Sequence, residues 1–198
     1  MQTKQHFRTI DITMCSIFVA LTAFGANITS FVPFLQIGGV PITLQTYFCI
    51  LSGTILGSRL GATAMSVYLF AGVIGLPIFA GFKGGIGAIF SPTFGFIISF
   101  IAVAYVTGKW IEWKQNPSLL TFITASFLGL IFNYVIGTNY MYLALTYWLE
   151  APAGFSYAQA WLIMLAYLPV DVLTIFIAGL TAPKVHRALH KTNKSFAL

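Results

Sequence analysis

The sequence contains very little charge. Only 7% of its 198 residues are Asp, Glu, Lys or Arg, whereas a soluble domain carries about a quarter. Hydrophobic residues make up 58% of the chain, and the mean hydropathy is +0.88. These values exclude an ordinary soluble domain and predict an integral membrane protein. Because a membrane-spanning helix needs about 20 mostly apolar residues, the chain has room for roughly five to seven spans.

Cysteine and histidine are also scarce, which limits the chemistry available inside the membrane. Cys15 and Cys49 each lie in an apolar run without a CxxC partner, so we expect small core residues rather than a disulfide. All the histidines lie in the polar ends of the chain: His6, His186 and His190. No imidazole is therefore available in the membrane, and the sequence predicts neither a metal site nor a cofactor.

The apolar runs predict an all-α protein with six transmembrane helices in one domain, residues 1–198. Proline, glycine and charged residues separate the runs. The predicted spans are 12–30, 44–58, 60–75, 93–113, 119–148 and 157–182. The second and third spans are short, so we expect them to tilt, to stop short or to form a tight helical hairpin. The first charge-free run continues from Ile12 to Arg59, which is too long for a cleavable signal peptide.

The basic residues predict the orientation of these spans. With six spans both termini lie on one side of the membrane, and every Lys and Arg except Lys83 falls on that side: Lys4, Arg8, Arg59, Lys109, Lys114, Lys184, Arg187, Lys191 and Lys194. Because cytoplasmic loops are enriched in Lys and Arg, we predict that both termini are cytoplasmic. The formal charge of +6 is then a signal of topology, and nucleic-acid binding is not predicted.

One carboxylate, Asp171, lies inside a predicted helix. A charge at membrane depth costs about 2.5 to 3.5 kcal/mol on insertion scales, so Asp171 is expected to face a partner or a polar cavity. Pro169, two residues earlier, is predicted to kink this helix. Tyr167 and Thr174 share a helix face with Asp171, and all three are candidates to bind a substrate. Alternatively, neighbouring hydroxyls and backbone groups freed at the kink satisfy Asp171.

Two segments on the side opposite the termini are candidates to enclose a cavity. Residues 75–95 are rich in glycine but lack the GK[ST] ending of a phosphate loop, so we expect a flexible lid or pocket wall. Within them, Lys83 is either a group that holds an anion or an ordinary solvated lysine. In residues 40–46, VPITLQT, the proline favours an extended backbone, so Thr43 and Gln45 are predicted to point together into the cavity.

Small residues recur at four-residue spacing, which lets helices approach one another closely. Gly53, Gly57 and Gly61 form one such set, and Ser16 and Ala20 form another. Most sets of this kind simply pack a helix bundle, and that is the first expectation for both.

Four stretches resemble the BioY family, the biotin-binding S components of energy-coupling factor (ECF) transporters: GVPITLQT, LSGTILGSRLGA, GLPIFAGFKGGIGAIFSPTFGF and LPVDVL. The resemblance covers nearly the whole chain. It implies a six-helix bundle in the lipid of a prokaryotic cell (inner) membrane that captures biotin from outside and is not an enzyme. It also implies a transmembrane coupling subunit, EcfT, and two cytoplasmic ATPases as partners. Ser16 and Ala20 are then candidates to contact the coupling subunit.

One position departs from the family pattern. The pattern resembles Asp followed three residues later by Lys, both turned to the ligand, but here Asp171 is followed by Thr174. We hypothesise that Lys83 in part replaces the missing cation and holds the carboxylate of biotin, while Asp171 accepts from a ureido N–H. The alternatives are a lower affinity or a ligand related to biotin.

Two other classes of protein remain as alternatives. A membrane enzyme acting on lipid or isoprenoid substrates usually needs clustered carboxylates or histidines, and a single intramembrane Asp gives it little support. A stand-alone secondary transporter would need a second intramembrane charge or an inverted repeat, and neither is evident.

Overall fold

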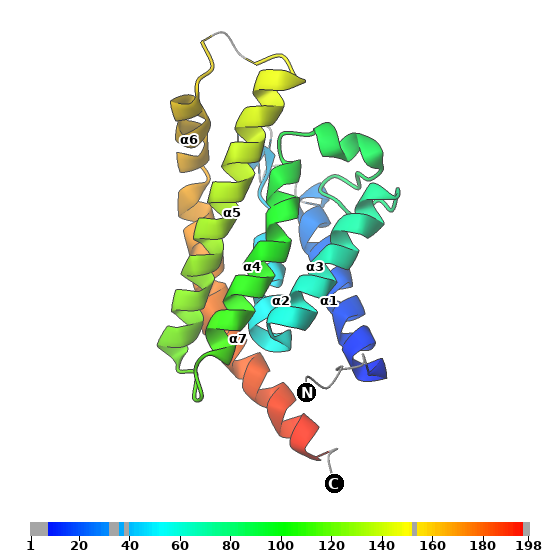
Figure 1. Ribbon diagram of the computed structural model, residues 1–198, viewed down its shortest axis with the longest axis vertical. Coiled ribbons are helices and arrows are strands. Elements are labelled where there is room, and N and C mark those ends of the chain that lie inside the picture. Colours follow the sequence, from blue (N-terminus) through cyan, green and yellow to red (C-terminus); the bar gives the residue numbers. More distant parts are fainter. Residues whose placement is uncertain (1–7, 32–35, 38–39, 152–153, 196–198) are drawn as a thin grey trace, which may run out of the picture.

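The computed structural model describes residues 8–31, 36–37, 40–151 and 154–195. In this part of the chain α1 to α6 run alternately up and down the bundle, and α7 continues in the direction of α6 (Figure 1). The elements are α1 (Thr9–Asn27), η1 (Ile28–Ser30), β1 (Gln36–Ile37), β2 (Val40–Pro41), α2 (Gln45–Leu56), α3 (Ser58–Val73), η2 (Ile86–Phe90), α4 (Phe94–Glu112), α5 (Leu119–Tyr147), α6 (Tyr157–Leu165) and α7 (Leu168–Ser195). The predicted helical bundle is confirmed, with one short antiparallel strand pair added to it.

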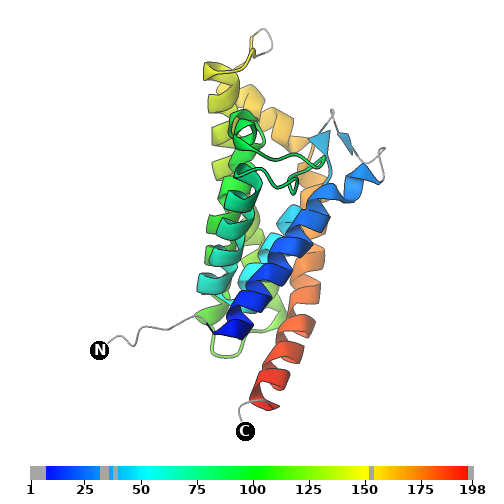
Figure 2. The same ribbon diagram turned by 90° about the vertical axis from the view of Figure 1, so that its right-hand side faces the viewer.

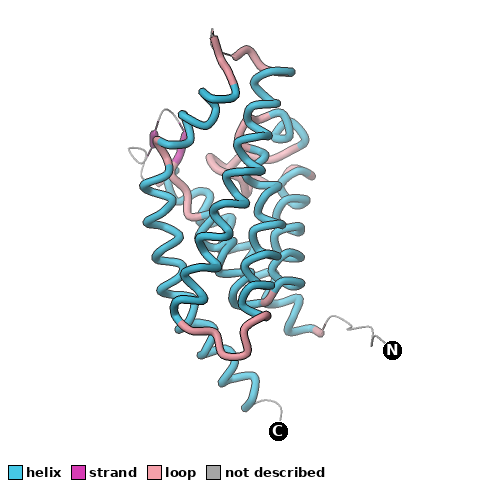
Figure 3. Tube along the Cα trace, turned by 60° about the vertical axis from the view of Figure 1, so that its left-hand side comes forward, coloured by secondary structure: helices cyan, strands magenta, loops and turns pink. Residues whose placement is uncertain are grey.

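The two ends of the bundle carry different elements. The start of α1 and the last turns of α7 lie at one end, which we call the terminal end (Figures 1 and 2). The α2–α3 and α4–α5 turns lie there too. The opposite end, the loop end, carries β1, β2, the segment between α3 and α4, and the α5–α6 connection. Helices occupy the space between the two ends (Figure 3). Lys83 thus lies at the loop end, whereas Arg59 and Lys109 lie at the terminal end, as their predicted spans required.

Four helices of the described part are long and apolar enough to cross a membrane: Thr9–Ser30, Phe94–Glu112, Leu119–Tyr147 and Leu168–Leu189. By contrast, α2 has 12 residues and α3 has 16. Their lengths are about 18 and 24 Å at 1.5 Å per residue, less than a hydrocarbon core about 30 Å thick. The predicted shortness of these two helices is therefore confirmed.

The last predicted span, residues 157–182, was wrong in two respects. It consists of two helices, because α6 ends at Leu165 and α7 begins at Leu168. It also does not end at Ala182, since α7 continues through Pro183 to Ser195. Pro183 removes one backbone hydrogen bond, but the Lys, Arg, Ala and Leu residues that follow it favour helix strongly enough for the helix to continue.

Glycines bring α2, α3 and α4 into close contact. A Cβ atom on Gly61 would lie 2.7 Å from the Cα atom of Gly53, and one on Gly108 would lie 2.6 Å from the carbonyl carbon of Gly57. The predicted packing role of Gly53 and Gly61 is thus confirmed. Gly57 has a different role, because it forms the α2–α3 turn with a φ of +86°, a conformation that favours glycine.

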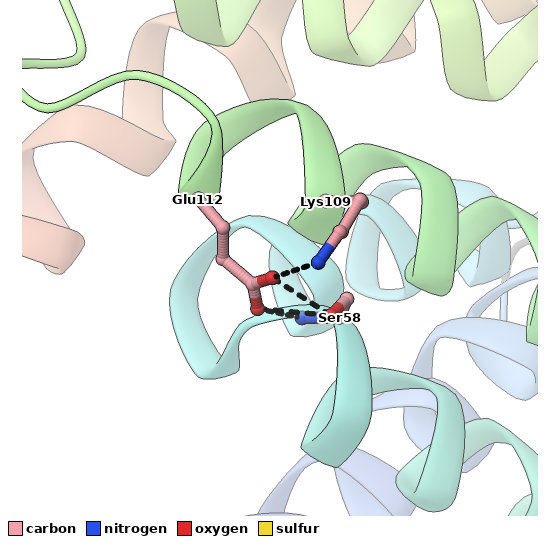
Figure 4. A network of polar contacts seen from close by, with 3 residues as sticks. All are labelled: Ser58, Lys109 and Glu112. Atoms are coloured by element: carbon pink, nitrogen blue, oxygen red, sulfur yellow. Dashed lines mark hydrogen bonds and ion pairs between the residues drawn. The ribbon is translucent and has the colours of Figure 1, made fainter.

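A carboxylate closes the terminal end of these three helices (Figure 4). Glu112, the last residue of α4, accepts a hydrogen bond from the backbone N–H of Ser58 at 2.7 Å and from its hydroxyl at 2.9 Å. Lys109 Nζ lies 3.6 Å from Glu112 Oε2. Because Ser58 is the first residue of α3, the negative charge lies at the positive end of that helix dipole. Glu112 therefore joins α3 to α4.

The cysteines are packed as predicted. Cys15 and Cys49 are both buried and both free thiols. Large apolar side chains such as Phe24, Phe70 and Leu120 are exposed on the outside of the bundle. This arrangement fits a protein whose surroundings are lipid rather than water.

Candidate functional site

The break between α6 and α7 places Asp171 at the start of a helix rather than inside one. The backbone N–H groups of Val170 and Asp171 both bond to the carbonyl oxygen of Tyr167, at 3.1 and 3.0 Å. Pro169 occupies the first turn of α7, where its missing N–H leaves no helical bond unmade. The predicted kink at the proline is thus a full interruption, and Asp171 gains the positive end of the α7 dipole.

The carboxylate of Asp171 has a tyrosine partner on another helix. The hydroxyl of Tyr134, on α5, donates to Asp171 Oδ2 at 2.6 Å. Tyr134 is buried and Asp171 is half-buried. Within the described ranges no other side chain donates to this carboxylate, so the expectation that a neighbouring hydroxyl satisfies Asp171 is confirmed for one oxygen. The other oxygen keeps the capacity to accept from a bound molecule.

Thr174 and Tyr167 lie on either side of Asp171 along the chain. The Thr174 hydroxyl donates to the carbonyl oxygen of Val170 at 2.8 Å, within its own helix. In this arrangement Thr174 can accept a hydrogen bond from a ligand but has no proton to donate. Tyr167 is half-buried and packs against the hydrophobic core.

Thr43 and Gln45 belong to a second polar cluster, at the start of α2. Thr43 Oγ1 donates to Gln45 Oε1 at 3.0 Å, Gln45 Nε2 donates to the Tyr68 hydroxyl at 2.9 Å, and that hydroxyl donates to the carbonyl oxygen of Ile78 at 2.9 Å. Gln45 and Tyr68 are buried. The cluster therefore links α2, α3 and the segment that follows α3.

The prediction that residues 40–46 are extended was wrong for their second half. Only Val40 and Pro41 are in a strand, and α2 already begins at Gln45. The Leu44 N–H bonds to the carbonyl oxygen of Gly25 at 2.9 Å, and the Leu44 carbonyl accepts from Phe48 at 3.1 Å. These two bonds turn the chain into a helix, so Thr43 and Gln45 meet through a side-chain bond rather than by strand alternation.

The segment between α3 and α4 is a small hairpin fastened to its neighbours. Phe79 and Lys83 exchange two backbone hydrogen bonds, at 2.9 and 3.2 Å. Phe79 is buried against the rings of Tyr68 and Phe94. The N–H of Phe82, whose φ is +54°, donates to Asn27 Oδ1 at 2.6 Å, which ties the hairpin to the end of α1. The segment predicted to be a flexible lid or pocket wall is therefore fastened to α1, α3 and α4. The Lys83 side chain is exposed.

The structure thus places the predicted residues in two clusters and one exposed position. Asp171 belongs to the first cluster, with Tyr134. Thr43 and Gln45 belong to the second, with Tyr68. In the described part of the chain no hydrogen bond joins the two clusters or links Lys83 to either. Both α2 and α7 begin inside the bundle rather than at its loop end, because α2 is only 12 residues long and α6 precedes α7.

A family model described as the BioY family matches residues 1–191. The chain belongs to the BioY family. BioYB of Bacillus subtilis (strain 168) is 40% identical over 188 residues, which make up 95% of this chain and 93% of that protein. The biotin transporter BioY of Rhodobacter capsulatus is 36% identical over 183 residues, covering 87% of this chain and 90% of the relative.

A solved structure has the same fold. The crystal structure of the S-component for biotin from an ECF-type ABC transporter matches with a TM-score of 0.62, covering 90% of this chain and 89% of that one. Because the two sequences are only 20% identical, this likeness concerns the fold of this BioY family member and not its individual residues.

Three residues of the two clusters and the hairpin anchor were missed by sequence reasoning. Tyr134 and Tyr68 are partners of predicted residues, and Asn27 fastens the hairpin. Each is a polar residue inside a predicted apolar span, which is a detectable signal. The sequence does not tell which of many such hydroxyls and amides faces Asp171 or Gln45.

No group of three or more His, Cys, Asp or Glu residues able to hold a metal occurs among the described residues.

Proposed function

We propose that this protein is a biotin-capturing S component of an ECF transporter. The observation that carries the proposal is membership of the BioY family over residues 1–191. Relatives named as biotin transporters and a fold match to the biotin S-component of an ECF-type ABC transporter support it. Capture of a vitamin requires a selective pocket but no catalytic groups, which distinguishes this role from that of a membrane enzyme.

The Asp171 cluster is suited to the ureido ring of biotin. That ring presents two N–H donors and one carbonyl acceptor. In this proposal Asp171 accepts from a ureido N–H with the oxygen that Tyr134 does not use, and Tyr134 holds the carboxylate in place. An unpaired N–H in a dry pocket costs about 1 to 3 kcal/mol, so Asp171 contributes most to selectivity. Tyr167 and Thr174 complete this side of the pocket, with Thr174 as an acceptor.

The Gln45 cluster and the hairpin would form the opposite side of the pocket. Gln45 has one amide proton beyond the one given to Tyr68, and Thr43 fixes its orientation. Lys83 lies on the hairpin with an exposed side chain. We assign to Lys83 the attraction of the biotin carboxylate, in place of the cation that the family pattern has at the position of Thr174.

We further propose six passes through a prokaryotic cell membrane, with both termini in the cytoplasm. α6 and α7 follow one another along the axis and together make the sixth pass (Figure 1). α2 and α3 make the second and third passes, and their shortness leaves room for a pocket above α2. The gathering of basic residues at the terminal end supports the cytoplasmic assignment.

Energy would come from partner subunits, a transmembrane coupling subunit and two cytoplasmic ATPases. Ser16 and Ala20 are both exposed on α1, and Ser16 turns its hydroxyl back to the carbonyl oxygen of Ile12 at 3.0 Å. This arrangement offers a smooth face for close helix contact. We propose that this face of α1 meets the coupling subunit.

Two experiments test the proposal. Calorimetry of biotin against the purified full-length protein is expected to give saturable binding without ATP. Biotin uptake in cells is expected only when the coupling subunit and ATPases are produced together with this chain. Uptake by this chain alone would favour a stand-alone vitamin transporter. Absence of biotin binding by folded protein would favour a related vitamin as the ligand.

A further inference from the structure

An open groove of about 480 Å³ lies at the terminal end of the bundle, remote from the hairpin and the loop end. Its lining includes Tyr105, Lys109 and Trp110 of α4, Trp113 directly after α4, and Leu128 of α5. Its volume falls in the range of about 300 to 1,000 Å³ that is typical of small-molecule sites. None of the clusters at the starts of α2 and α7 uses these residues.

Three side chains of the groove lie one after another along the axis of α4. Tyr105, Lys109 and Trp113 follow one another at four-residue spacing, so one face of α4 presents a phenol, an ammonium and an indole in succession toward the terminal end. Tyr105 is 49% exposed and Trp113 is 70% exposed. Leu128 adds an apolar wall from α5.

The aromatic walls are held in position by contacts with α5 and with each other. Trp110 Nε1 donates to Thr124 Oγ1 on α5 at 3.1 Å. The rings of Trp110 and Trp113 pack edge to face with centroids 5.8 Å apart. The groove is therefore formed before any molecule enters it.

The groove and the lysine beside it together carry a net positive charge. Lys109 lines it, and Lys114 Nζ lies 4.7 Å from the centroid of the Trp113 ring. Glu112 is also part of the lining, but Ser58 and Lys109 engage both of its oxygens and it points toward the start of α3 (Figure 4). Lys109 and Glu112 thus offset each other's charge, and Lys114 beside Trp113 leaves one positive charge in excess.

We propose that this groove binds one anionic phospholipid from the leaflet at the terminal end. The phosphate pairs with Lys109 and Lys114, the indoles and the Tyr105 phenol contact the glycerol region, and an acyl chain runs along Leu128. Trp and Tyr concentrate at the level of the headgroups, and lysines near that level favour anionic over zwitterionic lipids. The site is independent of biotin, so its test does not depend on the proposed transport function.

The first test measures retention of lipid by the full-length protein in detergent. Native mass spectrometry is expected to show one phosphatidylglycerol retained about 25-fold more tightly than phosphatidylcholine, since each of the two lysines contributes roughly a factor of five. K109Q/K114Q is expected to lose this preference. The matched control, K184Q/R187Q, also removes two exposed cations from the terminal end but lies on α7, and it is expected to keep the preference.

The second test locates the lipid and does not depend on a lysine variant. With Trp148 and Trp161 replaced by Phe, only Trp110 and Trp113 remain, and brominated phosphatidylglycerol is expected to quench them more than brominated phosphatidylcholine. Equal retention and equal quenching by the two lipids would overturn the proposal. So would an equal loss in both double variants, full competition by soluble glycerol phosphate, or a dimer that covers the groove.

Discussion

The bundle carries one carboxylate at its terminal end and another where α7 begins inside the bundle, and the two carboxylates are bonded differently. At the terminal end, Glu112 is engaged on both oxygens by Ser58 and Lys109. Near the loop end, Asp171 receives one described side-chain hydrogen bond, from Tyr134. A carboxylate with both oxygens paired stabilises packing, whereas one with spare acceptor capacity suits a ligand. The comparison therefore separates a structural end of the bundle from the proposed binding end, which is the half toward the loop end.

The largest effect is expected from filling the glycine contact at the terminal end. In Gly108→Ala the new Cβ would meet the backbone of Gly57 and Ser58, which cannot move aside easily. We expect a loss of about 3 kcal/mol in unfolding free energy, measured as a lower thermal midpoint in detergent. Gly87→Ala is the control, since nothing lies within 4 Å of its Cβ. Equal midpoints for the two variants would show that this contact is not tight.

Asp171→Asn tests the binding end. An amide can donate where a ureido N–H needs an acceptor, so we expect biotin affinity to fall by about 2 kcal/mol, roughly thirtyfold, with little change in thermal midpoint. Calorimetry measures the affinity. Asp11→Asn, at the terminal end of α1, removes the same charge and is expected to bind biotin normally. Unchanged binding by Asp171→Asn would remove this residue from the site.

The starts of α7 and α2 differ in how well the sequence predicted them. Pro169 and Asp171 are unusual in an apolar run, so the sequence identified both as candidates. It predicted a kink at Pro169 but not the break between α6 and α7. The partnership with Tyr134 was not visible, because hydrophobic content does not tell which helix face meets which neighbour. The extended prediction for Gln45 failed because the bond from Leu44 to Gly25, a contact from another helix, starts α2 earlier.

Glu112→Gln is expected to show the reverse of the Asp171 result. Loss of the charge weakens the hydrogen bonds to Ser58 and the interaction with the α3 dipole, which together amount to about 1 kcal/mol at this partly exposed position. We expect a lower thermal midpoint and unchanged biotin affinity. Glu150→Gln, an exposed residue of the loop end, serves as the control. A fall in affinity without a fall in midpoint would contradict the division between the two ends.

Asn27→Ala tests whether the anchored hairpin retains the ligand. The substitution removes the acceptor for the Phe82 N–H, a contribution of about 1 kcal/mol. If the hairpin closes the pocket, biotin is expected to dissociate about fivefold faster, as measured by release of labelled biotin. Asn139→Ala removes a half-buried amide of α5 that bonds to Val135 and Tyr157 rather than to the hairpin, and it is expected to leave the release rate unchanged. The same rate in both variants would mean that the hairpin does not close the pocket.

The smallest effect is expected from Lys83→Gln, because an exposed lysine contributes about 0 to 1 kcal/mol through charge. The expected loss of biotin affinity is therefore at most about fivefold. A comparison of two ligands shows whether this loss concerns the biotin carboxylate. Biotin methyl ester lacks the carboxylate, so Lys83→Gln should weaken biotin but leave the ester unaffected, whereas Asp171→Asn should weaken both. Equal effects of Lys83→Gln on the two ligands would mean that Lys83 does not attract the carboxylate. Thr174 would then mark a pocket that holds the acid without a cation.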